Sequence, residues 1–124
     1  MSISNDALRK VLLEIEQKSQ FSTQQMAIVK SQLAANARET RKLELTADEL
    51  GALPRETPMY EGVGKMFVQA SSQEVMDRLA AETQAHVKEK ENLDKKLHYL
   101  ETTYKNSREN FEQILKNAGG GVAA

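Results

Sequence analysis

Two long stretches of this chain repeat apolar residues every three or four positions, and a short stretch between them does not. The first covers residues 5–46 and the second covers residues 72–118. Two apolar positions in every seven residues are typical of coiled-coil helices, because they form one narrow apolar seam along each helix. The pattern therefore predicts a mainly α fold built on two long helices.

The predicted seams are mostly large and apolar, with a few small or polar positions. In the first helix they are Leu8, Leu12, Ile15, Ser19, Ser22, Met26, Val29, Leu33, Asn36, Thr40 and Leu43. In the second helix they are Met76, Leu79, Thr83, His86, Lys90, Leu93, Leu97, Leu100, Tyr104, Ser107, Phe111, Ile114 and Ala118.

The ends of both helices carry recognisable signals. Ser4 or Asn5 can cap the first helix, and either serine of the Ser71–Ser72 pair can cap the second. The first periodic pattern stops at residue 46, and Gly51 and Pro54 oppose any continuation. The glycines at 119–121 predict that the second helix ends at residue 118 and that residues 119–124 form a tail.

The interruption at residues 54–70 predicts a β-hairpin. Both prolines and three of the six glycines of the chain lie between Gly51 and Gly64. Strand-forming residues flank a turn expected near Gly64–Lys65, and Gly62 and Gly64 can adopt positive φ. An isolated two-stranded hairpin is marginally stable, so partner chains are expected to cover it. The residues assigned to subunit assembly are Met59, Tyr60, Val63, Met66, Phe67 and Val68.

A hairpin between two helices of similar length brings them together antiparallel. Ser19 and Ser22 then face the large side chain of Leu100, which preserves packing density. The middle of the seam is polar, because Asn36 comes near His86 with a lysine close by. The middle is therefore expected to be more loosely packed than either end.

The free ends of the two helices are richer in apolar residues than one seam can hide. Candidates for contact with another protein there are Leu8, Val11, Leu12, Leu13, Ile15, Phe111, Ile114 and Leu115. Residues at seam positions more often pack within the coiled coil than bind a partner. Val11, Leu13 and Leu115 lie off those positions, so they are the better candidates for external contact.

Composition narrows the function classes. With 124 residues, 5% aromatic residues and no tryptophan, the chain forms at most one domain, residues 1–124, with little material for a compact core. A net charge of −1 gives no basic face for nucleic acid. The sequence has no cysteine, no signal-peptide pattern at its start and no apolar run long enough for a membrane span. A cytoplasmic protein without nucleic-acid or membrane partners is expected.

No constellation of residues indicates catalysis. His86 and His98 lack the further ligands of a metal site, and they are interpreted as a polar seam residue and a solvated residue. The Gly62–Lys65 segment lacks the glycine spacing and the following Ser or Thr of a phosphate loop. We therefore expect no enzyme activity, and we assign no catalytic, cofactor-binding or metal-binding residues.

The order of helix, hairpin and helix, together with the tract from Thr57 to Phe67 and the following Ser72–Val75, resembles a beta-type subunit of the prefoldin family. The resemblance covers essentially the whole chain. It implies a heterohexamer of alpha-type and beta-type subunits whose hairpins close into a β-barrel platform. It further implies an ATP-independent chaperone that needs no cofactor, holds unfolded proteins such as actin and tubulin chains, and delivers them to the cytosolic group II chaperonin.

A second function class remains open, namely a structural coiled-coil scaffold or tether without client-holding activity. The two classes differ in what they require of the hairpin. A tether needs only a short polar turn, whereas exposed Tyr60, Val63, Met66 and Phe67 call for other sheets to cover them.

Overall fold

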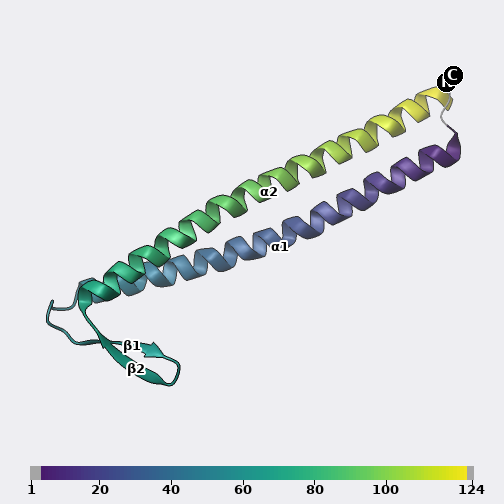
Figure 1. The fold of residues 1–124 in the computed structure, drawn as a ribbon. Helices are drawn as coiled ribbons and strands as arrows, with labels where there is room; N and C mark the ends of the chain where they lie inside the picture. The colour runs from purple at the N-terminus through teal and green to yellow at the C-terminus, as the bar shows by residue number, and fades with distance from the viewer. Residues whose placement is uncertain (1–3, 123–124) are drawn as a thin grey trace. The chain divides into compact units, whose positions relative to one another are not determined.

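The computed structural model describes residues 4–122, with side chains described for residues 4–117. Its elements are α1 (Asn5–Gly51), β1 (Met59–Val63), β2 (Met66–Ala70) and α2 (Ser72–Val122), as Figure 1 shows. The contacts divide the chain into two compact units. The hairpin unit is Leu33–Asn92, and the terminal unit combines the residues up to Gln32 with those from Leu93 onward.

The start of each helix is capped as predicted. The Ala7 amide donates to Ser4 Oγ at 3.2 Å, and the Glu74 amide donates to Ser71 Oγ at 3.1 Å. These bonds satisfy backbone donors that have no partner within the first turn. Ser71 is therefore the cap of α2, and Ser72 is its first residue.

Both helices continue beyond their predicted ends. The end expected at residue 46 was too early, because α1 continues to Gly51. The Thr46 hydroxyl donates to the Lys42 carbonyl, as in a continuing helix, and Ala47 and Leu50 pack on the hydrophobic cluster of the hairpin unit. The end expected at residue 118 was also too early, since α2 runs through the three glycines to Val122. Glycine weakens a helix but, unlike proline, removes no backbone donor. Residues 123–124 of the predicted tail lie outside the described residues.

The predicted seam is confirmed by burial along both helices. Every seam position assigned to α1 is buried or half-buried, and so is every described seam position of α2 except Lys90, which is exposed. A lysine gains nothing from an apolar seam without a charged partner, so its ammonium stays in water. The Ala118 side chain lies outside the described residues.

The two strands pair antiparallel, with Val63 opposite Met66 and a two-residue turn at Gly64–Lys65. This confirms the predicted turn. Gly64 has φ +62°, which suits the first central position of a type II′ turn. The expectation that Gly62 also needs positive φ was wrong, because Gly62 is an extended strand residue paired with Phe67.

The hydrophobic core of the hairpin unit lies where the strands meet the helices. Met59, Val75 and Leu79 are buried there, and Leu43, Ala47, Leu50, Ala70 and Met76 pack around them. The expectation that Met59 is exposed in the single chain was wrong, since the residue is only 7% exposed. Met59 is the first residue of β1, at the base of the hairpin, so its side chain packs against the helices of its own chain.

Candidate interaction surfaces

The hairpin presents two faces with different surroundings. Directly paired residues of antiparallel strands lie on the same face. One face, the inner face, therefore carries the pairs Met59–Ala70, Glu61–Val68 and Val63–Met66. It begins at the hydrophobic core and ends at the exposed side chains of Val63 and Met66.

An ion pair ties the inner face to α2. Arg78 Nη1 lies 2.8 Å from Glu61 Oε2, and both groups are partly exposed. The energy of such an accessible pair is small because water screens it, but its geometry helps to orient β1. The hairpin base is thus fixed by packing of Met59 and oriented by Glu61.

The opposite face, the outer face, is apolar and open. It carries Tyr60, Phe67 and Gln69, and Tyr60 and Phe67 are 62% and 78% exposed. A methyl group placed on Gly62 would lie 3.8 Å from Phe67 Cε1, so the ring lies beside the glycine without other cover. Aromatic side chains this exposed are typical of surfaces that another chain covers.

The edges of the hairpin are also open, because the sheet of the described residues has only the two strands β1 and β2. Unpaired backbone groups at a sheet edge can pair with a strand of another chain. Of the six residues that the sequence assigned to assembly, Tyr60, Val63, Met66, Phe67 and Val68 are exposed, and Met59 is not. The assembly role of all six stays a prediction.

The apolar residues of the terminal unit separate into two groups. Leu8, Leu12, Ile15, Phe111 and Ile114 are half-buried in the seam, whereas Val11, Leu13 and Leu115 are exposed. The Arg108 guanidinium lies 5.7 Å from the centre of the Phe111 ring, which covers part of that ring further. This arrangement agrees with the interpretation that the seam residues pack within the coiled coil. Contact with clients by any of the eight stays a prediction.

The polar middle of the seam contains a defined hydrogen-bond network within the hairpin unit. Asn36 is buried, and its Nδ2 lies 3.3 Å from His86 Nδ1, 3.2 Å from the His86 carbonyl oxygen and 3.2 Å from Glu89 Oε2. His98, by contrast, is exposed, as predicted. The network favours a single register between α1 and α2 in this unit, because the Asn36 side-chain amide reaches all three acceptors in one register only.

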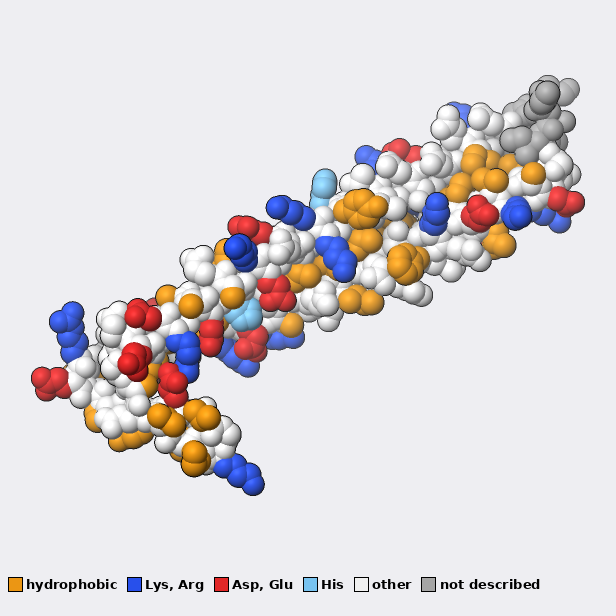
Figure 2. All heavy atoms as spheres, in the orientation of Figure 1, with side chains coloured by type: hydrophobic (Ala, Val, Ile, Leu, Met, Phe, Trp, Pro, Cys, Tyr) orange, Lys and Arg blue, Asp and Glu red, His pale blue; other side chains and the backbone are white. Residues whose placement is uncertain are grey.

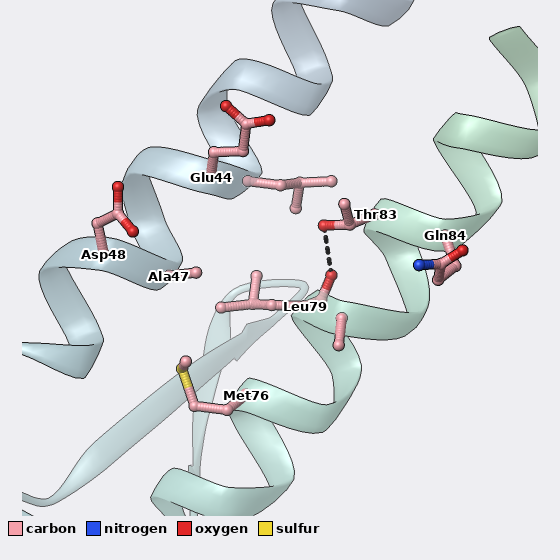
Figure 3. A pocket seen from close by; sticks show the side chains of 9 residues that line it. Glu44, Ala47, Asp48, Met76, Leu79, Thr83 and Gln84 are labelled. Atoms are coloured by element: carbon pink, nitrogen blue, oxygen red, sulfur yellow. Dashed lines mark hydrogen bonds between the residues drawn. The ribbon is translucent and has the colours of Figure 1, made fainter.

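A groove of about 480 Å³ lies between α1 and α2 in the hairpin unit, as Figure 3 shows. Two acidic residues line it, Glu44 and Asp48, and Glu44 pairs with Arg41 at 3.3 Å. The Thr83 hydroxyl donates to the Leu79 carbonyl at 2.8 Å. Within residues 4–122 no group of three potential metal ligands occurs, and no helix there is long and apolar enough to cross a membrane.

Sequence reasoning missed two exposed aromatic residues outside the seam. They are Phe21 and Tyr99 in the terminal unit, which are 60% and 69% exposed. The signal was present, because aromatic residues are scarce in this chain and both of these fall outside the predicted seam positions. The heptad pattern predicts which residues are buried in the seam, and it makes no prediction for the exposed positions between them.

Comparison with known proteins agrees with this architecture. The profile of the family "Prefoldin subunit" matches residues 14–118. Prefoldin subunit 1 of Mus musculus is 34% identical over 109 residues, which cover 87% of this chain and 88% of the relative. Prefoldin subunit 1 of Tetraodon nigroviridis is 31% identical over 112 residues, covering 90% of this chain and 91% of the relative.

A solved structure supports the same fold. The prefoldin beta subunit from Thermococcus strain KS-1 superposes with a TM-score of 0.52 at 20% identity, covering 97% of this chain and 95% of that one. Two long helices joined by one two-stranded hairpin are therefore shared between the two proteins. The chain belongs to the prefoldin subunit family, whose members are components of a molecular chaperone and assemble with other prefoldin subunits.

Proposed function

We propose that this chain is a beta-type subunit of a heterohexameric, ATP-independent chaperone of the cytosol. Its hairpin joins those of alpha-type and beta-type partners in a β-barrel platform. The apolar residues of its terminal unit hold unfolded clients of the actin and tubulin type. The assembly then delivers those clients to the group II chaperonin.

The observation that carries this proposal is the open hairpin. Its inner face leaves Val63 and Met66 exposed beyond the core, and its outer face exposes Tyr60 and Phe67. Burying a large apolar side chain fully is worth roughly 1.5–3 kcal/mol, so four such residues supply a substantial driving force for association. Strand pairing with neighbouring hairpins would also satisfy the open edges of β1 and β2.

Client holding has a different basis. Val11, Leu13 and Leu115 are exposed near the chain ends. Non-directional apolar contact suits a protein that must hold many unrelated unfolded chains. Leu8, Leu12, Ile15, Phe111 and Ile114 would add to this surface only where the seam opens.

The alternative is a scaffold or tether that binds partners and holds no clients. The open hairpin does not separate the two functions alone, because a scaffold could assemble in the same way. The exposed apolar residues of the terminal unit favour client holding, since a tether would do better with polar residues there.

The test compares assembly and holding in one preparation. Native mass spectrometry of the chain alone and after co-expression with alpha-type and other beta-type subunits should show a defined hexamer only in the second case. That hexamer should suppress aggregation of denatured actin, and removal of residues 1–11 and 108–124 from this chain, with the partner subunits trimmed likewise, should weaken suppression severalfold without dissociating it. A stable monodisperse monomer would contradict the assembly proposal. Full holding by the trimmed hexamer would contradict the client site.

A further inference from the structure

A second exposed apolar site lies in the terminal unit, apart from the residues near the chain ends. Phe21 on α1 and Tyr99 on α2 each directly precede a buried seam residue, Ser22 and Leu100. Each lies about 100° round its helix from that seam residue, so the ring points away from the seam and into water. Figure 2 shows hydrophobic side chains on the visible face of both helices in this unit.

These four residues line one groove of about 430 Å³, which we call the aromatic groove. Phe21 and Tyr99 form its exposed sides, and buried Ser22 and Leu100 contribute to its floor. Its volume lies near the lower end of the range for ligand-binding pockets. It has room for a large side chain with part of its backbone, but not for a folded domain.

The charges on the rim of the groove cancel. Glu14 and Lys18 line it one helical turn apart and carry opposite charges. The other polar lining residues, Gln17 and Thr103, are uncharged and can both donate and accept hydrogen bonds. The groove therefore favours neither an acidic nor a basic ligand, and it suits an uncharged one.

We propose that the aromatic groove binds an uncharged, extended segment of unfolded polypeptide. One large apolar side chain of the segment lies between Phe21 and Tyr99, and its backbone amides bond to Gln17 and Thr103. An extended segment needs such partners, because its backbone groups are not satisfied internally as those of a helix are. The inference rests on the proposed client-holding function, but it shares no residue with the terminal apolar residues.

The test uses the hexamer in which this chain is full-length and the partner subunits are trimmed at their chain ends, so that client sites of the partners do not bind the probe. The variants are Phe21→Gln, Tyr99→Gln and the double variant, because glutamine keeps helix propensity and adds no charge. Leu45→Gln is the matched control, since Leu45 is an exposed apolar residue of α1 in the hairpin unit. The probe is a fluorescent 15-residue peptide of Gly, Ser and Gln with a central Leu-Phe pair, together with versions in which the flanking Gln residues are Glu or Lys.

The double variant should bind the uncharged peptide at least 10-fold more weakly, and the control should change the dissociation constant less than twofold. Both charged versions should bind the unaltered hexamer more weakly than the uncharged one. A photo-crosslinking residue at position 21 should attach to the peptide.

If the double variant binds the peptide with unchanged affinity, in a hexamer that still holds denatured actin, the proposed role of the aromatic groove is refuted while the proposed client-holding function is not. A preference for either charged peptide would do the same, as would crosslinking of position 21 to another subunit in place of the peptide. Failure of the unaltered hexamer to hold any denatured client would instead overturn the proposed function, and this inference with it.

Discussion

Met59 and Met66 differ in their surroundings although both are methionines of the same hairpin, and this allows a paired test. Met59 is 7% exposed in the hydrophobic core of its own chain, whereas Met66 is 68% exposed near the turn. Truncating a buried methionine to alanine costs about 2–5 kcal/mol, because it removes apolar burial and leaves a cavity. Met59→Ala should therefore release the hairpin from the helices, and Met66→Ala should not.

Hydrogen exchange of the hairpin amides in the isolated chain measures this difference. A loss of about 2 kcal/mol corresponds to roughly 30-fold faster exchange in β1 and β2 for Met59→Ala. Met66→Ala should leave those rates within about twofold in the isolated chain, and should weaken assembly with partner subunits instead. Faster exchange in Met66→Ala than in Met59→Ala would refute the assignment of the two residues to internal packing and to assembly.

Three further predictions follow from single residues. Asn36→Leu should leave the helical content of the chain unchanged but permit misaligned or intermolecular helix pairing, seen as additional species by light scattering; a single species would contradict the register role of the Asn36 network. Ser19→Ala should raise the free energy of unfolding in urea by about 1 kcal/mol, because the buried Ser19 hydroxyl has no hydrogen-bond partner among the described residues; a loss of stability would contradict this. Gly64→Ala should destabilise the hairpin by about 1–2 kcal/mol in hydrogen exchange because Gly64 has φ +62°, while Gly62→Ala should change it less; equal effects would contradict the turn assignment.

The sequence sufficed for the helices and their pairing because the responsible signals are local and repetitive. A seven-residue spacing identifies a seam wherever it recurs, and the prediction that Asn36 meets His86 follows from the antiparallel return alone. Lys90 departed from the pattern because its charge outweighs its position. The turn at Gly64–Lys65 was also predictable, since glycine is favoured at that point of a tight hairpin.

Features that depend on packing between distant segments were less predictable. Met59 looked like the other apolar residues of the hairpin, and only the approach of Val75 and Leu79 distinguishes it. The end of α1 at Gly51 depends likewise on Ala47 and Leu50 reaching the same core. The aromatic groove requires Phe21 and Tyr99 to come together from two helices, and no single stretch of sequence contains that information.

The central claim is that partner subunits cover the exposed residues of the hairpin, and the absence of cysteine from the chain allows a direct measurement. Val68→Cys introduces a single thiol in β2 at a residue that is about half exposed, and Lys30→Cys introduces one on α1 as a control. The rate of iodoacetamide modification of each thiol would be followed by mass spectrometry of this chain, alone and assembled with partner subunits. Assembly should slow the reaction at position 68 at least 10-fold and leave position 30 within about twofold, because iodoacetamide cannot reach a buried thiol. Equal rates at position 68 in the isolated and assembled chain would show that partner subunits leave the hairpin uncovered.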